Sequence, residues 1–472
     1  MATPHQGLRI LLVKTCYSSP LFRTAFHPLG IMSLAAVCRQ RGHTVRLVHR
    51  LTCKEDLGRI VQRFRPDLVG ISALTQEASE MVELARDVKA VDSGIPVVAG
   101  GPHPTHFPRE VLANEEIDFV VMGEGEVTFP LLLERLGDGE VEGLPGVAHR
   151  RGGEIVVGPP AEPMEDLDSL PFPAWDLIAF DEYEKHQMQS RLSPRRYGSI
   201  FSSRGCPFRC IYCHNIFGKK IRARSTQNTF AEMEMLMDRY GVVHFEFADD
   251  YFNFSRRRVH ELCDLIIASG RKFTIAFANG LRGDLLDLAL MEKMRAAGVI
   301  YIVFAVETAS PRLQRLIRKE ADLDKLAENI RISSKLGIFT QGVFMLGFPS
   351  ETEEEANQTI AYACQSHLTF ASFFVVKPTK GTALWEMVRD KAESAEVHLE
   401  SQDYHSFHPN LSAMSDAALQ RVYGRANRRF YLSPRRLLKI NKMMLEGRRT
   451  PGFFKFYLDN LILLLKRLLR GG

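Results

Sequence analysis

Three cysteines that lie close together offer the clearest chemistry in this 472-residue chain. The stretch from Arg204 to Asn215 reads RGCPFRCIYCHN and places Cys206, Cys210 and Cys213 in a C-x3-C-x2-C array. Thiolates this close cannot all pair as disulfides, because one is left over. They are also one short of the four ligands of a closed zinc site or a fully cysteine-ligated iron–sulfur cluster. The array therefore indicates a metal site with an open position.

Two simpler interpretations of the array remain. His214 could complete a structural zinc site, or the thiols could be buried without any ligand role. His214 directly follows Cys213 and is badly placed to join it on one ion. Gly205, Pro207 and Arg209 describe a loop instead of a core element. Cysteine spacing in such a setting favours the cluster.

The array resembles the cluster motif of the radical S-adenosylmethionine (SAM) superfamily. In that family three cysteines hold a 4Fe-4S cluster, and the methionyl part of SAM chelates the fourth iron. The resemblance implies that Cys206, Cys210 and Cys213 are the metal ligands. Tyr212 matches the aromatic residue that the family places against the adenine.

The composition is that of an ordinary globular protein, with 45% hydrophobic and 25% charged residues. The length allows two or three domains. Eight cysteines without regular spacing, and no apolar signal segment, predict a reducing, cytoplasmic location. A formal net charge of +5 does not point to nucleic acid.

Strand and helix patterns alternate over roughly the first 140 residues. This alternation predicts an α/β fold with a doubly wound parallel sheet, whose ligands bind outside the carboxyl ends of the strands. The expected strands are Leu8–Val13, Val45–Val48, Leu68–Ser72, Pro96–Ala99 and Phe119–Val121. The expected helices are Leu29–Arg41, Lys54–Arg63, Glu77–Lys89, Pro108–Ala113 and Thr128–Arg135.

Three loops at the ends of these strands form a candidate binding rim. Glycine pairs there let a backbone approach a ligand closely, although each loop alone reads as a plain turn. Together with the helix at Pro28–Ala36, they resemble the cobalamin-binding domain that precedes many radical SAM cores. The candidate cobalamin contacts are Ser72, Thr75, Gly100, Gly101, Gly123 and Glu124.

The candidate cobalamin domain lacks one known motif. The D-x-H-x-x-G sequence that supplies an axial histidine in methionine-synthase-like domains is absent, and His103 and His106 have neither its spacing nor its position. The resemblance then implies that cobalamin is held without a protein histidine on cobalt. The alternative is a fold that has lost its cofactor or binds only protein.

Residues 141–195 are expected to form a hairpin and a linker. The hairpin is expected at Leu144–Val157, and the connector runs from Pro159 to Arg195. Trp175 is expected to pack at the junction and not to contact substrate.

Residues 196–395 read as six βα units, which predict a partial TIM-type barrel with its chemistry at the carboxyl ends of the strands. The expected strands are Ile200–Ser203, His244–Ala248, Thr274–Ala278, Ile300–Val306, Phe339–Met345 and Ser372–Val376.

Polar residues follow these strands where barrel chemistry needs them. Asp249 and Asp250 match the family's contact to the SAM ammonium, and a carboxylate is a sound partner for it. The resemblance adds Asn279, Glu307, Gly347 and Pro349 as SAM contacts. Each also has a structural interpretation: Asp249 could cap a helix, Glu307 could pair with a lysine, and Ser350 with Glu353 could form a capping box.

Residues 396–472 read as a helical, basic region. From Tyr431 onward there are ten basic and two acidic residues, and the longest uninterrupted apolar stretch, Leu461–Leu465, is far too short to span a bilayer. Phe453–Leu469 could lie on an anionic membrane surface, and the competing interpretation is a terminal helix packed on the barrel.

The resemblance as a whole implies a cobalamin-dependent radical SAM C-methyltransferase. Such an enzyme forms a 5′-deoxyadenosyl radical, acts on an unactivated carbon of a small, possibly hydrophobic molecule, and takes electrons from a donor such as flavodoxin or ferredoxin. A radical SAM oxidative cyclase or ring-rearranging enzyme, which transfers no methyl group, shares the two-domain layout and is the main alternative. A non-catalytic SAM sensor or electron-transfer protein would not need a barrel lined with Asp249, Asp250, Asn279 and Glu307.

Overall fold

The computed structural model describes residues 7–16, 26–138, 141–186, 188–190, 196–214, 216–394, 407–434 and 436–439. The chain divides into two compact units. The first comprises Met1–His186 together with the short segment Asn215–Arg224, and the second comprises Gln187–His214 and Ser225–Gly472.

The first unit is built on a seven-stranded sheet in the order β2-β1-β3-β4-β5-β6-β7. Its strands are β1 (Arg9–Lys14), β2 (Thr44–His49), β3 (Leu68–Ser72), β4 (Val97–Gly100), β5 (Phe119–Val121), β6 (Val147–Arg151) and β7 (Glu154–Val157). Strands β1 to β5 pair in parallel. The expected hairpin forms as β6 and β7 and extends this sheet with antiparallel pairing.

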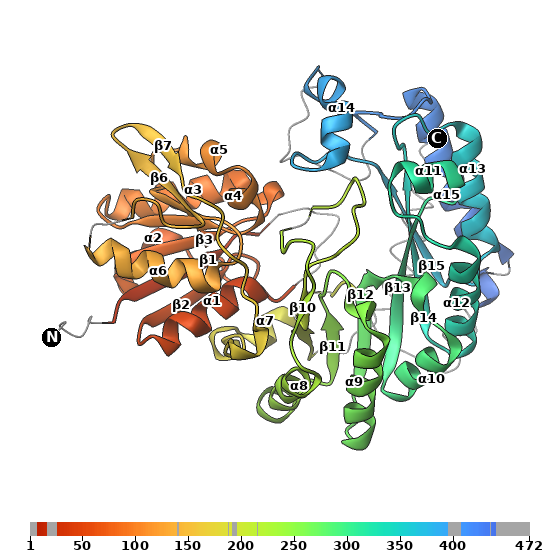
Figure 1. Ribbon diagram of the computed structural model, residues 1–472, viewed down its shortest axis with the longest axis horizontal. Helices are drawn as coiled ribbons and strands as arrows, with labels where there is room; N and C mark the ends of the chain where they lie inside the picture. The colour runs from red at the N-terminus through yellow and green to blue at the C-terminus, as the bar shows by residue number, and fades with distance from the viewer. Residues whose placement is uncertain are drawn as a thin grey trace. The chain divides into compact units, whose positions relative to one another are not determined.

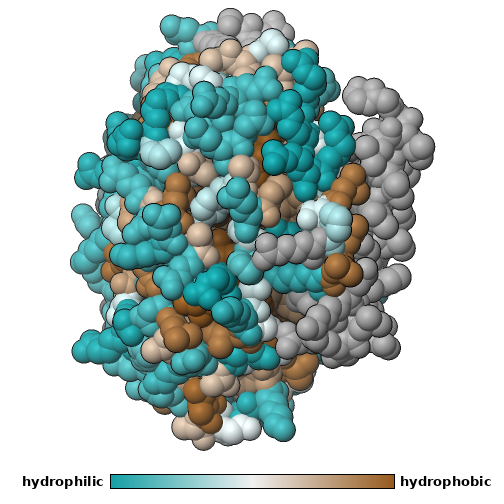
Figure 2. Space-filling model, turned by 90° about the vertical axis from the view of Figure 1, so that its right-hand side faces the viewer, coloured by the Kyte–Doolittle hydropathy of each residue, from teal (hydrophilic) through white to brown (hydrophobic). Residues whose placement is uncertain are grey.

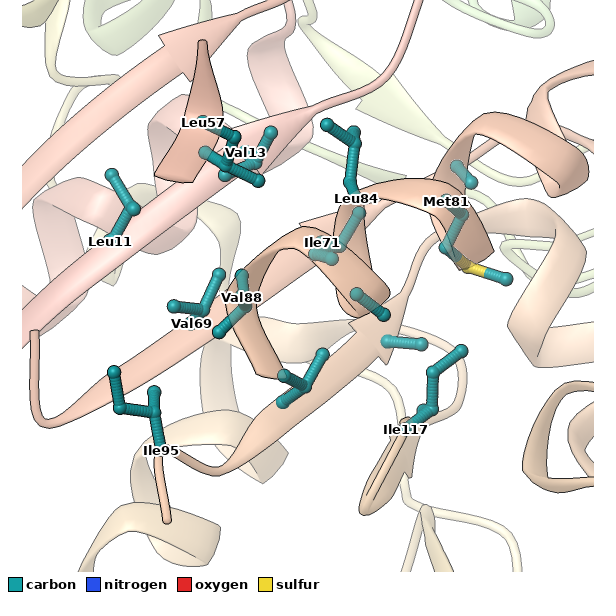
Figure 3. Packing of buried hydrophobic residues seen from close by; sticks show 14 of the residues in the cluster. Leu11, Val13, Leu57, Val69, Ile71, Met81, Leu84, Val88, Ile95 and Ile117 are labelled. Atoms are coloured by element: carbon teal, nitrogen blue, oxygen red, sulfur yellow. The ribbon is translucent and has the colours of Figure 1, made fainter. Parts of the chain in front are cut away.

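Helices cover both faces of this sheet. They are α1 (Leu29–Gln40), α2 (Leu57–Phe64), α3 (Ala78–Val91), α4 (Pro102–His106), α5 (Pro108–Leu112) and α6 (Gly125–Asp138). Alternate residues of β1 face opposite sides, so Ile10 and Leu12 pack in one core with α1 and α6, while Leu11 and Val13 pack in the other with α2 and α3. Figure 3 shows Leu11 and Val13 in the second core. An all-apolar central strand is thus the signature of the doubly wound fold.

The connector of the first unit carries short helices: the 3₁₀ turns η2 (Leu167–Ser169) and η3 (Trp175–Leu177), and α7 (Phe180–Tyr183). Trp175 is buried, and its ring lies 5.8 Å from Phe180 and 5.1 Å from His27. Burial lowers the pKa of His27 to about 3, so its imidazole is neutral. Trp175 therefore packs inside the first unit.

The second unit is a six-stranded parallel sheet in the order β15-β14-β13-β12-β11-β8. Short β10 (Arg222–Ala223), which follows the cysteines, belongs to the first unit. The strands of the second unit are β8 (Gly198–Ile200), β11 (His244–Phe247), β12 (Thr274–Leu281), β13 (Val299–Glu307), β14 (Phe339–Leu346) and β15 (Phe370–Val375), with short β9 (Ser203–Arg204) before the cysteines. This is the expected partial barrel.

Helices alternate with the barrel strands, and α12 and α13 lie along the outer side of the sheet in Figure 1. The helices of the second unit that follow its strands are α8 (Thr226–Tyr240), α9 (Arg256–Ala268), α10 (Leu288–Ala296), α11 (Pro311–Leu316), α12 (Leu323–Lys335), α13 (Glu353–Gln365) and α14 (Ala383–Ser394). The second unit also has 3₁₀ turns at η4 (Phe252–Phe254) and η5 (Gly283–Leu285), and the first unit has one at η1 (Thr75–Glu77).

Two helix caps that the sequence offered as alternative interpretations do not form. Thr352, not Ser350, caps α13 and forms the capping box with Glu355, because Ser350 has a positive φ of 61°. Ser255, not Asp249, caps α9. Both true caps lie closer to the first helical residue than the residues that the sequence suggested.

The described part of the basic C-terminal region forms α15 (Asp416–Tyr431), which packs against α13. Arg425 bonds to Glu353 and Asn357 of α13, at 3.1 and 2.8 Å. Figure 2 views the side carrying α12, α13 and α15, where hydrophilic side chains predominate. None of the helices within the described ranges has the length and hydropathy that a bilayer span requires. Phe453–Leu469 lies outside the described residues.

Replacing Leu11 with alanine tests the core of the first unit. Leu11 is fully buried in β1, so truncation should lower the free energy of unfolding by about 2–5 kcal/mol. Thermal or urea unfolding of the anaerobic protein measures the change. Leu131→Ala on α6, where the side chain is exposed, is the matched control. Equal effects of the two substitutions would contradict the core assignment.

Candidate functional site

The three cysteines lie in an irregular loop beyond the carboxyl end of β8. Backbone hydrogen bonds fix this cluster loop (residues 206–213) on two sides: Ile211 N donates to Ile317 O at 3.1 Å, and Leu384 N donates to Ile211 O at 2.8 Å. All three cysteines are free thiols. Cys206 and Cys210 lie within electrostatic range of the Cys213 thiol.

The chemistry of the donor set decides whether this loop suits a metal cluster. Across the described residues, no three cysteine, histidine or carboxylate side chains already converge tightly enough to hold a metal ion. Three thiols on a loop free of disulfides nevertheless supply the ligands of three corners of a cubane cluster and leave one corner open. The residues present therefore fit a 4Fe-4S cluster.

Asp249, an expected SAM contact, is buried and engaged in hydrogen bonds within the protein. It is 2% exposed, and its carboxylate accepts hydrogen bonds from the Ser202 hydroxyl at 2.7 Å and the Ser203 hydroxyl at 2.5 Å. Burial raises the pKa of Asp249, while Arg258 and the serine hydrogen bonds oppose that rise. Asp249 therefore secures the chain just before the cluster loop.

Asp250 and Asn279, at the same end of the barrel, are both exposed. Asp250 accepts a hydrogen bond from the Gly205 backbone amide, beside Cys206. Asn279 Nδ2 donates to the Asp249 carbonyl at 2.9 Å. Asn279 is part of β12 and does not follow it. Of the two neighbouring aspartates, only Asp250 has its carboxylate open to a ligand.

Glu307 ends β13 and is held by a lysine that the sequence did not identify. Its Oε1 accepts from Lys319 Nζ at 3.1 Å and from the Tyr212 hydroxyl at 3.2 Å. Burial, together with the Glu307 charge, raises the pKa of Tyr212 well above its ordinary value. Glu307 Oε2 is buried and has no hydrogen-bond partner among the described residues. A buried acceptor without a donor is costly, so it suits a ligand that donates.

The loop after β14 is shaped by Glu351. Gly347 has a φ of 93°, which favours glycine, and its amide and the Phe348 amide both donate to Glu351 Oε2. Burial raises the pKa of Glu351 to about 7, opposed by these two amides. Phe348 lies 6.1 Å from the Tyr212 ring. Gly347 is buried and Pro349 is half-buried beside it.

Four of the rim residues come together at the carboxyl edge of the first sheet. A Cβ on Gly101 would lie 2.8 Å from Ser72 Oγ, so only glycine fits against that strand end. The Thr105 hydroxyl donates to Gly101 O at 2.8 Å and accepts from Gly123 N at 3.0 Å. Gly100 O accepts from Ala73 N at 3.0 Å. Bare backbone converging here lets a ligand approach the strand ends closely.

No local sequence pattern identified the residues that support this rim. Glu77 is 6% exposed and accepts from the Thr15 hydroxyl at 2.6 Å, from Leu74 N at 2.8 Å and from Lys14 Nζ. Thr75 lies in the turn that Glu77 closes. This buried carboxylate therefore fixes the end of β1 against the loop after β3.

Glu124 is another expected ligand contact whose side chain is engaged within the protein. Its carboxylate forms a two-point ion pair with Arg222, and the two side chains are 6% and 2% exposed. Arg222 also donates to Met164 O at 2.6 Å and Phe217 O at 3.0 Å. A carboxylate engaged in this way has little capacity to bind cobalamin. It secures the segment that follows the cysteines.

Comparison with known families assigns both units. Residues 22–133 match the B12 binding domain, and residues 200–363 match the radical SAM superfamily. The chain is 30% identical to the uncharacterized methyltransferase PH0819 of Pyrococcus horikoshii, over 92% of this chain and 94% of that protein.

Two further relatives differ in their reactions. Cytidylyl-2-hydroxyethylphosphonate methyltransferase of Streptomyces wedmorensis is 28% identical, over 78% of this chain and 79% of its own. Anaerobic magnesium-protoporphyrin IX monomethyl ester cyclase of Rubrivivax gelatinosus is 26% identical, over 82% of this chain and 71% of its own.

Solved structures share the fold. The cobalamin-dependent SAM radical enzyme OxsB, with aqua-cobalamin and SAM bound, superposes with a TM-score of 0.75 at 16% identity, over 98% of this chain and 75% of its own. The radical SAM methyltransferase TsrM of Kitasatospora setae, with cobalamin and a [4Fe-4S] cluster bound, superposes with a TM-score of 0.68 at 19% identity, over 88% of this chain and 85% of its own.

Substitutions of Asp249 and Asp250 should have different effects on stability and on iron retention. Asp249→Asn places an amide donor against serine hydroxyls, so it should cost about 1.5–3 kcal/mol of stability and reduce the iron retained after reconstitution. Asp250→Asn should retain as much iron as the wild type. Iron and sulfide analysis with thermal unfolding measures both. Equal iron in the two variants would contradict the role given to Asp249.

The elevated pKa of Glu351 predicts a pH dependence of stability. A carboxyl whose folded pKa is raised from 4.5 to about 7 contributes stability that is present below pH 4.5 and is lost as the pH rises through 7. From about pH 5 to about pH 8, the thermal midpoint of the wild type should therefore fall relative to Glu351→Gln. Glu354→Gln, at an exposed position of α13, is the control. Parallel curves for all three proteins would refute the assignment.

Proposed function

This chain belongs to the radical SAM enzymes that carry a B12 binding domain, and we propose that it methylates an unactivated carbon of a small-molecule substrate. One observation carries the proposal: the same chain has an open three-thiol loop at the barrel mouth and a glycine-lined rim on a cobalamin-type sheet. Two of the relatives described above are named methyltransferases. The cofactors of this family are a 4Fe-4S cluster, SAM and cobalamin.

The cysteines hold the cluster in this proposal. Cys206, Cys210 and Cys213 are its three ligands, and the open corner accepts SAM. When bound, the cofactors supply the electron that cleaves SAM and the methyl group that is transferred. The protein contributes binding, orientation and exclusion of water, which are the tasks of its loops.

The SAM contacts that we propose surround this loop. Glu307 Oε2, the buried acceptor without a partner, receives a hydrogen bond from a donor group of SAM. Asp250 takes the role expected of the aspartate pair, with its carboxylate toward the ammonium. Tyr212, Gly347 and Pro349 border the same space, and Asn279 adds an exposed amide.

The cobalamin contacts that we propose are backbone-rich. Ser72, Gly100, Gly101 and Gly123 present small side chains or none, and Thr75 stands in the adjacent turn. Glu124 is left out because of its ion pair with Arg222. In this proposal, as the sequence resemblance implies, no histidine among the described residues binds cobalt.

A second candidate function is oxidative cyclisation. The relative from Rubrivivax gelatinosus is a cyclase, and the match spans both units of this chain. Such an enzyme would form 5′-deoxyadenosine without transferring a methyl group. For either reaction we propose a small flavodoxin or ferredoxin as the electron donor.

Product analysis tests the proposed function. Reduced, reconstituted protein given SAM should release 5′-deoxyadenosine, and with hydroxocobalamin it should also form S-adenosylhomocysteine. Mutating Cys206, Cys210 and Cys213 to alanine should reduce 5′-deoxyadenosine at least about 100-fold, because the electron source is lost.

The control for this assay is Cys364→Ala, a half-buried cysteine on α13 away from the array. Its product yields should match the wild type. 5′-Deoxyadenosine without cobalamin-dependent S-adenosylhomocysteine would favour the cyclase. Release of 5′-deoxyadenosine by the triple variant would overturn the cluster assignment.

A further inference from the structure

A strained stretch of backbone lies against the cluster loop. Arg318 and Glu320 have positive φ angles of 54° and 50°, a region that side-chain-bearing residues seldom adopt. Such residues are strained and persist only where the surroundings impose them. Gln314 holds the stretch: its carbonyl accepts from Lys319 N at 3.2 Å and its Oε1 accepts from Ala321 N at 3.2 Å.

This strained stretch contacts the cysteines directly. Ile317 O accepts from Ile211 N at 3.1 Å. Arg318 O accepts a weak hydrogen bond from the Cys210 thiol at 3.9 Å. Lys319 Nζ reaches Glu307 and the hydroxyl of Tyr212, at 3.1 and 3.4 Å. Ile317, Arg318 and Lys319 therefore each contact the cluster loop or Glu307.

Arg282 connects this stretch to the other side of the loop. Its guanidinium carbon lies 4.1 Å above the centroid of the Phe208 ring, between Cys206 and Cys210 in sequence. Its Nη1 donates to Lys319 O at 3.2 Å. Asp284 holds the same group by two hydrogen bonds of 3.0 and 2.7 Å, and the two side chains are 13% and 6% exposed. One rigid group thus touches both the cluster loop and the strained stretch.

We propose that Arg282 is a positioning residue that sets the geometry of the cluster loop by clamping Phe208 against the Lys319 carbonyl. The proposal rests on the cluster loop of the proposed function, and not on methyl transfer. Only arginine combines a flat face for the ring with a fork of donors for both Asp284 and the carbonyl. A lysine side chain keeps the positive charge but lacks the planar group and the paired donors, so the clamp depends on the shape of the guanidinium group.

The reactivity of the cysteines in the metal-free protein tests the clamp. Anaerobic, iron-free protein is treated with iodoacetamide, and the alkylation of each cysteine peptide is followed by mass spectrometry. Arg282→Met and Arg282→Lys should both raise the alkylation rates of Cys206 and Cys210 several-fold. Cys364 on α13 serves as the internal reference and should not change.

The matched control is Arg271, which forms the same kind of two-point pair with Asp238, at 2.6 and 3.1 Å, away from the cysteines. Arg271→Met and Arg271→Lys should leave all rates at the wild-type value. Wild-type protection of Cys206 and Cys210 in Arg282→Lys would show that charge alone suffices and overturn the proposal. A rise at Cys364 as large as that at Cys210 would show general loosening and also overturn it.

A double-mutant cycle adds a readout that a merely structural residue would not move. Phe208→Leu keeps an apolar side chain and removes the ring, so it should raise the same rates. If Arg282 acts through Phe208, the double variant should react no faster than the faster single variant. If the rate increases of the two single variants multiply in the double variant, the clamp is contradicted. Because no iron, SAM or corrinoid is present, a failed methyl-transfer assay leaves this result unaffected.

Discussion

The cluster loop has no regular secondary structure, so everything that it does depends on how neighbouring strand ends hold it. Asp249 fixes the serines before it, Ile317 and Leu384 hold its backbone, and Arg282 stacks on Phe208. The barrel supplies these partners because its parallel strands end at one edge, where loops from distant parts of the sequence meet. A loop that must leave one metal position open needs this external support.

Buried charges near the loop follow a consistent pattern. Arg282 pairs with Asp284, and Lys319 pairs with Glu307, so each cation lies beside a carboxylate in surroundings from which water is excluded. Such pairs contribute little net stability, since desolvation offsets much of their attraction. Their value lies in orientation. Glu307 still keeps one oxygen without a partner among the described residues, and that oxygen is the part of the pair available to a ligand.

Sequence reasoning recovered the architecture because it rests on local patterns. The apolar run of β1 and the regular recurrence of strands predicted both sheets, and the cysteine spacing identified the loop. It failed where side-chain partners come from distant segments. Nothing local tells that Asp249 meets Ser202, or that Glu124 meets Arg222 nearly a hundred residues away. Lys319 lacked a motif for the same reason, and the position of Arg282 after a barrel strand did not reveal its contact with Phe208.

One chain of this protein should hold both an iron–sulfur cluster and a corrinoid. This is tested by metal and corrinoid analysis of protein reconstituted anaerobically with iron, sulfide and hydroxocobalamin, then desalted and examined by visible and Mössbauer spectroscopy. We expect about four irons per chain in a cubane cluster together with stoichiometric corrinoid. Iron without corrinoid, after the same treatment, would contradict the presence of both cofactors on one chain.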